Sequence, residues 1–396
     1  MTTALCGKSA LEYWRTPPLV RALALHPDNP SDDFDLPLSR EELRGLRNDT
    51  FFELEIWRND SVLSARGRPL MSDSSLDVLD SIALISPGIS APIEILVSSR
   101  EDRRRSSLIR PSVMSDDLSA PELSIISKHL YVTSPALTLL TLAPRISLAR
   151  LVMIASELCG SFSIYRTPPS LAHALEDLHA NHLLPKVSSW SPSFDSSGHL
   201  TDLWSRPPLT SPEKIAALAA RARGRRGRRA LEQAAELVVA NAASPFEVQA
   251  GVLLGFPYGL GGEGYAGFSH NHEVALSDAA RRLAGRRTCR CDLFWPASQG
   301  FRAVDLECQS RIYHTGEERG LSDANRSTAL QSMDIEVILA TYAQFEDVRR
   351  FDALSLTIAQ KIGRRPPIHT RGFLDSRAEL RSQVLVSWGE LLSDLS

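Results

Sequence analysis

Two stretches decide the fold of this chain: Cys291-Asp292-Leu293-Phe294-Trp295-Pro296 and, after a short turn, Val304-Asp305-Leu306-Glu307-Cys308-Gln309. Each is short, apolar at alternate positions and bounded by Pro, Gly or Ser, so the pattern predicts two neighbouring strands of a hairpin. Because side chains alternate between the two faces of a strand, Asp305, Glu307 and Gln309 are expected in one row. One face of the second strand is therefore predicted to be acidic.

Asp292 lies in the middle of the first predicted strand. A carboxylate in that position needs a partner, a metal ion or water to offset the loss of its hydration. Glu307 is expected on the adjacent strand, and two carboxylates on adjacent strands outline a site for a divalent metal. The sequence therefore predicts that Asp292 and Glu307 bind one metal ion together.

Further motifs follow the acidic strands in a fixed order: His314, then Asp323 and Arg326, then the apolar run from Ile335 to Thr341. Ser244-Pro245-Phe246-Glu247 precedes them. In this order the chain resembles PD-(D/E)xK nucleases, and among them the very-short-patch-repair-type endonuclease-like domains of bacteria, over about residues 244 to 365. The resemblance implies an α/β fold with a restriction-endonuclease-like mixed sheet flanked by helices.

The resemblance also implies hydrolysis of DNA phosphodiester bonds with Mg²⁺ held by Asp292 and Glu307. In this hypothesis Gln309 orients the attacking water, and His314 acts as a base or proton shuttle. Glu247 has two interpretations. It is either part of the same site or the second member of a capping box, since it lies three residues after a serine at a helix start.

The chain departs from the family pattern directly after Glu307. The family has Asp and then Gly there, and the wider superfamily has Lys two residues after the Glu, whereas this chain has Gln309 and Ser310. Gln orients water but neither carries positive charge nor accepts a proton at neutral pH. Two hypotheses follow: an endonuclease in which the metal lowers the pKa of the attacking water, or a catalytically impaired DNA-binding or antitoxin-like regulatory protein.

Contact with DNA phosphates must come from local patches, because the net charge of the whole chain is −3. Residues 221–229 contain six arginines in nine positions, between two predicted helices at 212–222 and 228–240. This cluster is either a phosphate clamp or a solvated turn. Arg326 either binds a phosphate bidentately or pairs with Asp323 on its own helix. The predicted DNA-contacting residues are Arg225, Arg226, Arg228, Arg229 and Arg326.

The length of 396 residues suggests more than one domain. We expect an α+β unit at 1–165, a Pro- and Ser-rich linker at 166–210, and the endonuclease-like unit with a leading helical pair at 211–396. The sequence shows neither a signal peptide nor an apolar run of about 20 residues. It therefore predicts a cytoplasmic protein with no membrane association.

The first unit combines a predicted strand at Leu130–Pro135 with apolar helices at Ala136–Leu142 and Leu148–Leu158, after a short helix at Ser9–Arg15. In this order it resembles AbiEi-antitoxin-like modules that bacteria join to such a nuclease-like domain. That resemblance implies a toxin–antitoxin-type protein partner, and a homodimer is also an expectation.

The five cysteines are odd in number and scattered, which argues against a disulfide framework. Cys289, Cys291 and Cys308 could bind zinc, but a fourth ligand at the usual spacing is missing. Buried apolar thiols fit the same alternate positions. The Gly-rich loop at 259–264 lacks the lysine and the strand-to-helix context of a nucleotide-binding loop.

Overall fold

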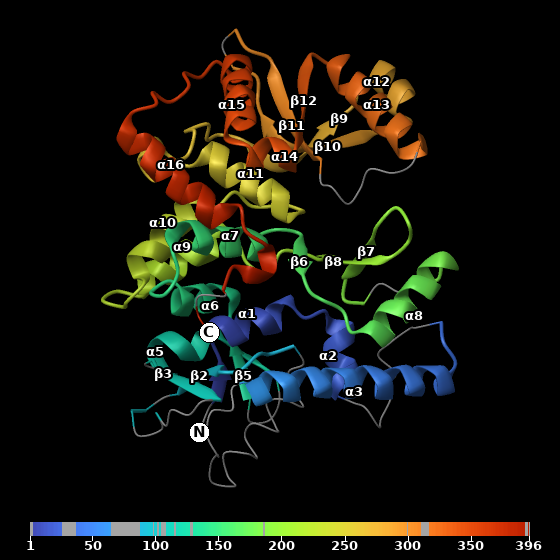
Figure 1. Ribbon diagram of the computed structural model, residues 1–396, viewed down its shortest axis with the longest axis vertical. Helices are drawn as coiled ribbons and strands as arrows, with labels where there is room; N and C mark the ends of the chain where they lie inside the picture. Colours follow the sequence, from blue (N-terminus) through green and yellow to red (C-terminus); the bar gives the residue numbers. More distant parts are fainter. Residues whose placement is uncertain are drawn as a thin grey trace.

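The computed structural model describes residues 3–25, 37–64, 88–97, 99–100, 103, 108–114, 116–126, 130–184, 187–298, 300–309, 317–392 and 395. These residues form three sheets with helices between and around them. In Figure 1 the C-terminal sheet lies at the top, a group of helices lies across the middle, and the N-terminal sheet lies below them.

The N-terminal sheet has five strands in the order β3-β2-β1-β5-β4. It is mixed, because β1 pairs antiparallel with β2 and parallel with β5. The strands are β1 (Thr3–Leu5), β2 (Ile93–Val97), β3 (Ile109–Val113), β4 (Leu123–Ile125) and β5 (Leu130–Thr133). The helices of this region are α1 (Gly7–Arg15), α2 (Pro18–Leu25), α3 (Arg40–Ser64), α5 (Asp116–Ser119), α6 (Pro135–Leu142) and α7 (Leu148–Leu158). The predicted strand at 130–135 and helices at 9–15, 136–142 and 148–158 are confirmed.

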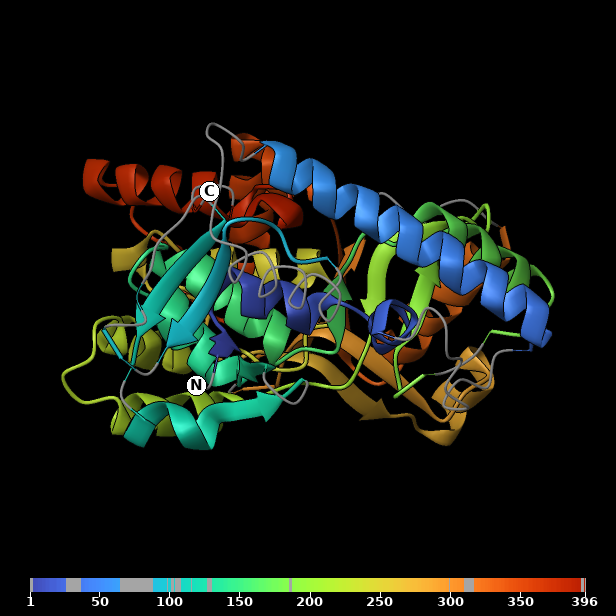
Figure 2. The same ribbon diagram turned by 90° about the horizontal axis from the view of Figure 1, so that it is seen from below.

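Residues 166–210, which we expected to be a linker, contain regular structure. They hold α8 (Pro169–Ala180), β7 (Ser191–Phe194) and β8 (Leu200–Ser205), and β8 pairs with β6 (Phe162–Ile164). Leucines of α8 pack with Trp190 and Trp204 in a separate small core, to which α2 also contributes. Figure 2 shows α8 beside the long helix α3. Pro and Ser residues stand at the ends of these short elements, which is why composition alone suggested a linker.

The largest core joins side chains from all three thirds of the chain. It includes side chains of α6 and α7, of α9 (Pro212–Arg221) and α10 (Arg228–Leu237), and of α11 (Pro245–Gly255). Strands β10 (Thr288–Trp295) and β11 (Ala303–Gln309) contribute to the same core. The C-terminal tail returns to the N-terminal sheet, where the backbone oxygen of Leu395 accepts a hydrogen bond from Arg110 at 3.0 Å.

The C-terminal sheet has the order β12-β11-β10-β9. The remaining strands are β9 (Ser269–Ala275) and β12 (Ile335–Thr341). The predicted hairpin is confirmed, because β10 and β11 pair antiparallel with Leu293 opposite Leu306. β9 pairs antiparallel with β10, and β12 pairs parallel with β11 through the crossover helix α13 (Glu317–Gln331). With α11 in front, the order is helix, three strands, helix, strand, interrupted by the short helix α12 (Asp278–Ala284).

Helices cover both faces of this sheet. One face packs on α11 and on α15 (Val348–Ile362), and the other packs on α12 and α13. After α15 the chain forms α16 (Arg371–Val384). Thr370 caps the start of this helix, its hydroxyl accepting the Phe373 N–H at 3.2 Å. The short segments α14 (Tyr342–Glu346), η1 (Ala120–Glu122), η2 (Tyr258–Leu260) and η3 (Trp388–Glu390) complete the elements.

The protein therefore belongs to the mixed α/β class, as predicted. Among the helices in the described ranges, none has the length and apolar character that a membrane crossing needs.

Candidate functional site: an acidic cluster between β10 and β11

Asp292 interrupts the regular pairing of β10. Cys291 pairs with His272 and Leu293 with His270, whereas the residue opposite Asp292 is Asn271, whose φ is 49°. Cys291 packs toward α12 and α13, but Leu293 packs toward α11, although residues two apart on a regular strand share a face. The Asp292 carboxylate turns toward β11 and accepts the backbone N–H of Cys308 at 2.8 Å. This irregularity directs Asp292 between the two strands.

Glu307 lies on β11 close to that point and is 9% exposed. Its carboxylate forms an ion pair with Arg326 of α13, which also donates to the backbone oxygen of Arg290. The crossover helix thus contributes a guanidinium to the acidic side of the sheet. From the sequence we expected Arg326 either to bind a phosphate or to pair with Asp323. The structure shows it paired with Glu307, and the side chain of Asp323 lies outside the described atoms.

Asp305 precedes Glu307 by two residues on β11 and is fully buried. Neither of its carboxylate oxygens has a hydrogen-bond donor in ordinary geometry. The Glu307 carboxyl and the Cys291 thiol lie close enough to influence its pKa. A buried carboxylate without donors is unfavourable unless it is protonated or neutralised by a cation.

Glu247 lies in the first turn of α11 and has the capping geometry that the sequence allowed. Its carboxylate accepts the Ser244 hydroxyl at 2.8 Å and the Ala243 N–H at 2.8 Å. A third hydrogen bond comes from the Asn271 amide at 2.7 Å. The same carboxylate is also close enough to Asp292 for the two charges to repel each other. Glu247 therefore both caps its helix and borders the acidic cluster.

Burial raises the pKa of every carboxyl group in this cluster. Loss of hydration is the largest cause in each case. Repulsion by Asp292 adds to it and raises the pKa of Glu247 to about 8, while repulsion by Glu307 helps raise that of Asp292 to about 7. The pKa of Asp305 rises to about 6, and that of Glu307 to about 9 because Asp305 is beside it.

The cluster holds more potential negative charge than its neighbours offset. Its members are Glu247, Asp292, Asp305 and Glu307. Within the described part of the chain, Arg326 is the cationic side chain that contacts it. His270 does not add charge, because burial lowers its pKa to about 4 and its Nδ1 lies 3.1 Å from the Asp292 backbone oxygen. A bound cation would relieve this imbalance.

The donor set fits magnesium in its chemistry. Mg²⁺ prefers carboxylate oxygens and is usually held by one or two of them together with water. Asp292 and Glu307 supply such oxygens, and Asp305 interacts electrostatically with both of them. In the described residues no three His, Cys, Asp or Glu side chains already converge as ligands. Cys289, Cys291 and Cys308 are free thiols. Cys289 and Cys291 pack among apolar side chains, which is the arrangement expected of buried apolar thiols.

Two other predicted catalytic residues follow Glu307. Gln309 is the last residue of β11, is partly buried, and lies opposite Thr341 of β12. His314 lies outside the described residues. Asp305 was predicted in the acidic row but was not assigned to the site. The signal that could have identified it is the same alternation that placed Glu307.

The arginine-rich turn lies away from the acidic cluster. Residues 222–227 connect α9 to α10, and these helices pack on α6 and α7 rather than on the C-terminal sheet. Arg225, Arg226 and Arg229 are exposed. Arg228 is partly buried, donates to the Ala219 backbone oxygen at 3.0 Å and pairs with Glu232 at 3.3 Å. A phosphate contact at this turn would therefore be remote from Asp292.

No protein-family model, curated protein or solved structure matches this chain.

Proposed function

We propose that this protein is a metal-dependent DNA endonuclease. The observation that carries the proposal is the buried excess of carboxyl groups where β10 and β11 meet, above all Asp305 with its two unsatisfied oxygens. The order of helix, three strands, helix and strand supports it, because this is the arrangement that the resemblance to PD-(D/E)xK nucleases implies. Carboxyl groups with strongly shifted pKa values gather at functional sites.

In this proposal Asp292 and Glu307 would hold Mg²⁺, which would lower the pKa of the attacking water and neutralise charge on the phosphoryl oxygens. Arg326 moves from Glu307 to the scissile phosphate, which a guanidinium binds in two-pronged fashion. Gln309 orients the water through its amide. Glu247, whose pKa of about 8 lies near neutral pH, is suited to exchange a proton during the reaction.

A second candidate function is a catalytically impaired, nuclease-fold DNA-binding or antitoxin-like regulatory protein. The ion pair between Glu307 and Arg326 favours it, because a carboxylate neutralised by arginine has less need of a metal. The absence of an acid or lysine at Gln309 favours it as well. The two candidates differ in whether Mg²⁺ displaces Arg326 from Glu307.

A plasmid-nicking assay separates the candidates. Supercoiled plasmid is incubated with the full chain in MgCl₂ or in EDTA, and open-circular product is measured over time. The endonuclease proposal requires product in MgCl₂, its loss in EDTA, and its loss in Asp292→Asn. Asp278→Asn is the matched control, since that residue is an exposed acid on α12. Nicking by Asp292→Asn at the wild-type rate, or no Mg²⁺-dependent nicking by any form, would contradict the proposal.

A further inference from the structure

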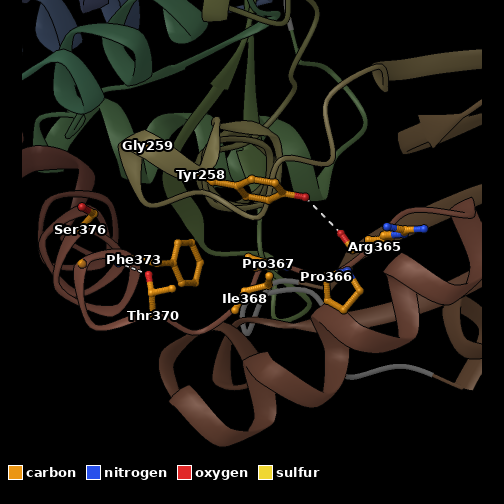
Figure 3. Close-up of a pocket in the computed structure, with 10 residues that line it drawn as sticks. Tyr258, Gly259, Arg365, Pro366, Pro367, Ile368, Thr370, Phe373 and Ser376 are labelled. Carbon is orange, nitrogen blue, oxygen red and sulfur yellow. Dashed lines mark hydrogen bonds between the residues drawn. The ribbon is translucent and has the colours of Figure 1, made fainter.

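A second candidate site lies at the far end of α11. Its cavity of about 590 Å³ is bounded by η2, by the loop that joins α15 to α16, and by the first turns of α16. Figure 3 shows the Tyr258 ring above this cavity, Phe373 at one side, and Pro366, Pro367 and Ile368 below. None of the residues of the acidic cluster contributes to its lining.

The aromatic rings of this cavity are held in place, and that of Tyr258 remains accessible. The Tyr258 hydroxyl donates to the Arg365 backbone oxygen at 3.1 Å, which fixes the ring over the loop. Tyr258 is nevertheless 46% exposed. Phe373 meets it edge-on with ring centroids 6.4 Å apart. Ile368 is 83% exposed beside them, so an apolar side chain is also available at the cavity.

The loop that bounds the cavity carries charge of one sign. The loop Gly363-Arg364-Arg365-Pro366-Pro367-Ile368-His369-Thr370-Arg371 contains three arginines and no acidic residue. Arg364, Arg365 and Arg371 are all exposed. Gly372 of the first turn of α16 also lines the cavity, so the positive end of that helix adds to the same potential. The first acidic residue beyond the loop is Asp375.

Aromatic faces beside exposed arginines match the chemistry of single-stranded nucleic acid. Bases stack on aromatic side chains with little dependence on sequence, and cationic groups bind the phosphates between them. We propose that this cavity binds an unpaired nucleotide, with its base against Tyr258 and Pro366 and its phosphates near Arg364, Arg365 and Arg371. The choice of nucleic acid as the ligand rests on the proposed function. The part of the substrate that the cavity would hold is an unpaired nucleotide.

The position of the cavity fits this role. Glu247 begins α11 at the acidic cluster, whereas Tyr258 follows its end. The 11 residues of α11 span about 16 Å at the usual rise of a helix. A stacked strand that rises about 3.4 Å per nucleotide along its axis covers this distance in about five nucleotides. In Figure 1 α16 and β10 lie on opposite sides of α11. A strand cut at the cluster can therefore reach the cavity with a flanking base.

Binding is measured by fluorescence anisotropy with a short labelled oligothymidine in EDTA, so that cleavage plays no part. Tyr258→Ala is expected to weaken binding about tenfold, because stacking on one aromatic ring is lost. Tyr258→Phe keeps the ring and should bind within about twofold of wild type. Ile368→Glu should weaken binding by charge repulsion, whereas the neutral Ile368→Gln should not. These two changes are at an exposed position and leave the fold intact.

If both Tyr258→Ala and Ile368→Glu bind oligothymidine with wild-type affinity, the proposal is wrong. The cavity would then bind another ligand, such as a protein segment. Asp292→Asn separates this result from the failure of the nuclease proposal. In that background Tyr258→Ala should weaken oligothymidine binding about tenfold, as in the wild type, whether or not the acidic cluster cleaves DNA. Loss of nicking with retained, Tyr258-dependent binding supports the cavity alone, and retained nicking without such binding supports the cluster alone.

Discussion

The carboxylate of Asp292 accepts the backbone N–H of Cys308 at 2.8 Å, so an acidic side chain of β10 takes the place of a strand-to-strand hydrogen bond with β11. The bond connects the candidate metal ligand to the strand that carries Glu307. The Asp292 side chain is therefore also part of the sheet. Changing this residue has two separate consequences: loss of its charge, and loss of the hydrogen-bond acceptor for the Cys308 N–H.

Asp292→Asn and Asp292→Ala should therefore differ in stability but not in activity. Asn retains an oxygen acceptor for Cys308, whereas Ala leaves a buried N–H without a partner, at a cost of about 1–3 kcal/mol. Both should lower any Mg²⁺-dependent nicking by about 10²-fold or more, since both remove a charged ligand. Urea denaturation and the plasmid assay measure the two effects. Equal stability of the two variants would mean that the bond to Cys308 contributes little.

The stability of the metal-free protein should fall as pH rises from about 5 to 9. Asp305, Asp292, Glu247 and Glu307 have folded-state pKa values of about 6, 7, 8 and 9, all above the ordinary values of carboxyl groups. The folded state therefore binds protons more tightly than the unfolded state, and this stabilisation is lost as pH rises through those values. Saturating Mg²⁺ should reduce the loss, because a bound cation favours the ionised carboxylates. Denaturation midpoints at several pH values, with and without Mg²⁺, check this.

Asp305→Asn should stabilise the metal-free protein at pH 9. The substitution removes a fully buried charge whose oxygens lack donors, for a gain on the order of 1–3 kcal/mol. At pH 5 the gain should be smaller, because the carboxyl is then largely protonated. Asp334→Asn is the control, since that acid is exposed and pairs with Arg302 at 2.8 Å. A destabilised Asp305→Asn variant at pH 9 would show that Asp305 is a structural residue.

The strands of the C-terminal sheet were predictable because their apolar alternation and bounding Pro, Gly and Ser residues are local signals. The hairpin of β10 and β11 and the helix α11 follow from such signals. The contact between Glu307 and Arg326 does not, because it depends on how α13 packs after the crossover. The break in alternation at Asp292 also escaped prediction, since it depends on Asn271 of the neighbouring strand.

The region at 166–210 was interpreted as a linker for a related reason. Its strands β7 and β8 are four and six residues long, and β8 is stabilised by its partners on both sides rather than by a pattern of its own. Burial of Trp190 and Trp204 against α2 is a long-range event. Sequence periodicity detects long, amphipathic elements such as α15 far better than it detects such short ones.

The arginine turn should contribute non-specific DNA affinity if it binds phosphates. Replacing Arg225, Arg226 and Arg229 by Ala should flatten the slope of log affinity against log salt concentration by about one unit for each phosphate that the turn neutralises. Arg228 is left in place, because it connects α10 to α9 through the Ala219 backbone oxygen. The control replaces three other exposed arginines, Arg40, Arg44 and Arg100. An unchanged slope in the first variant would identify the cluster as a solvated turn.

The last prediction concerns Gln309, which ends β11 beside Glu307 and stands where the nucleases that this chain resembles have Lys or Asp. Without either group, the attacking water lacks a charged neighbour, and loss of one well-placed electrostatic group typically lowers a rate by about 10²–10³-fold. We therefore expect slow cleavage by the wild type. Gln309→Lys, or Gln309→Asp combined with Ser310→Gly, should raise the Mg²⁺-dependent nicking rate. Gln309→Asn is the control, because it keeps the amide and adds no charge. If neither gain-of-charge variant nicks faster and isothermal titration detects no Mg²⁺ binding to any form, the regulatory, antitoxin-like candidate is the better account of this acidic cluster.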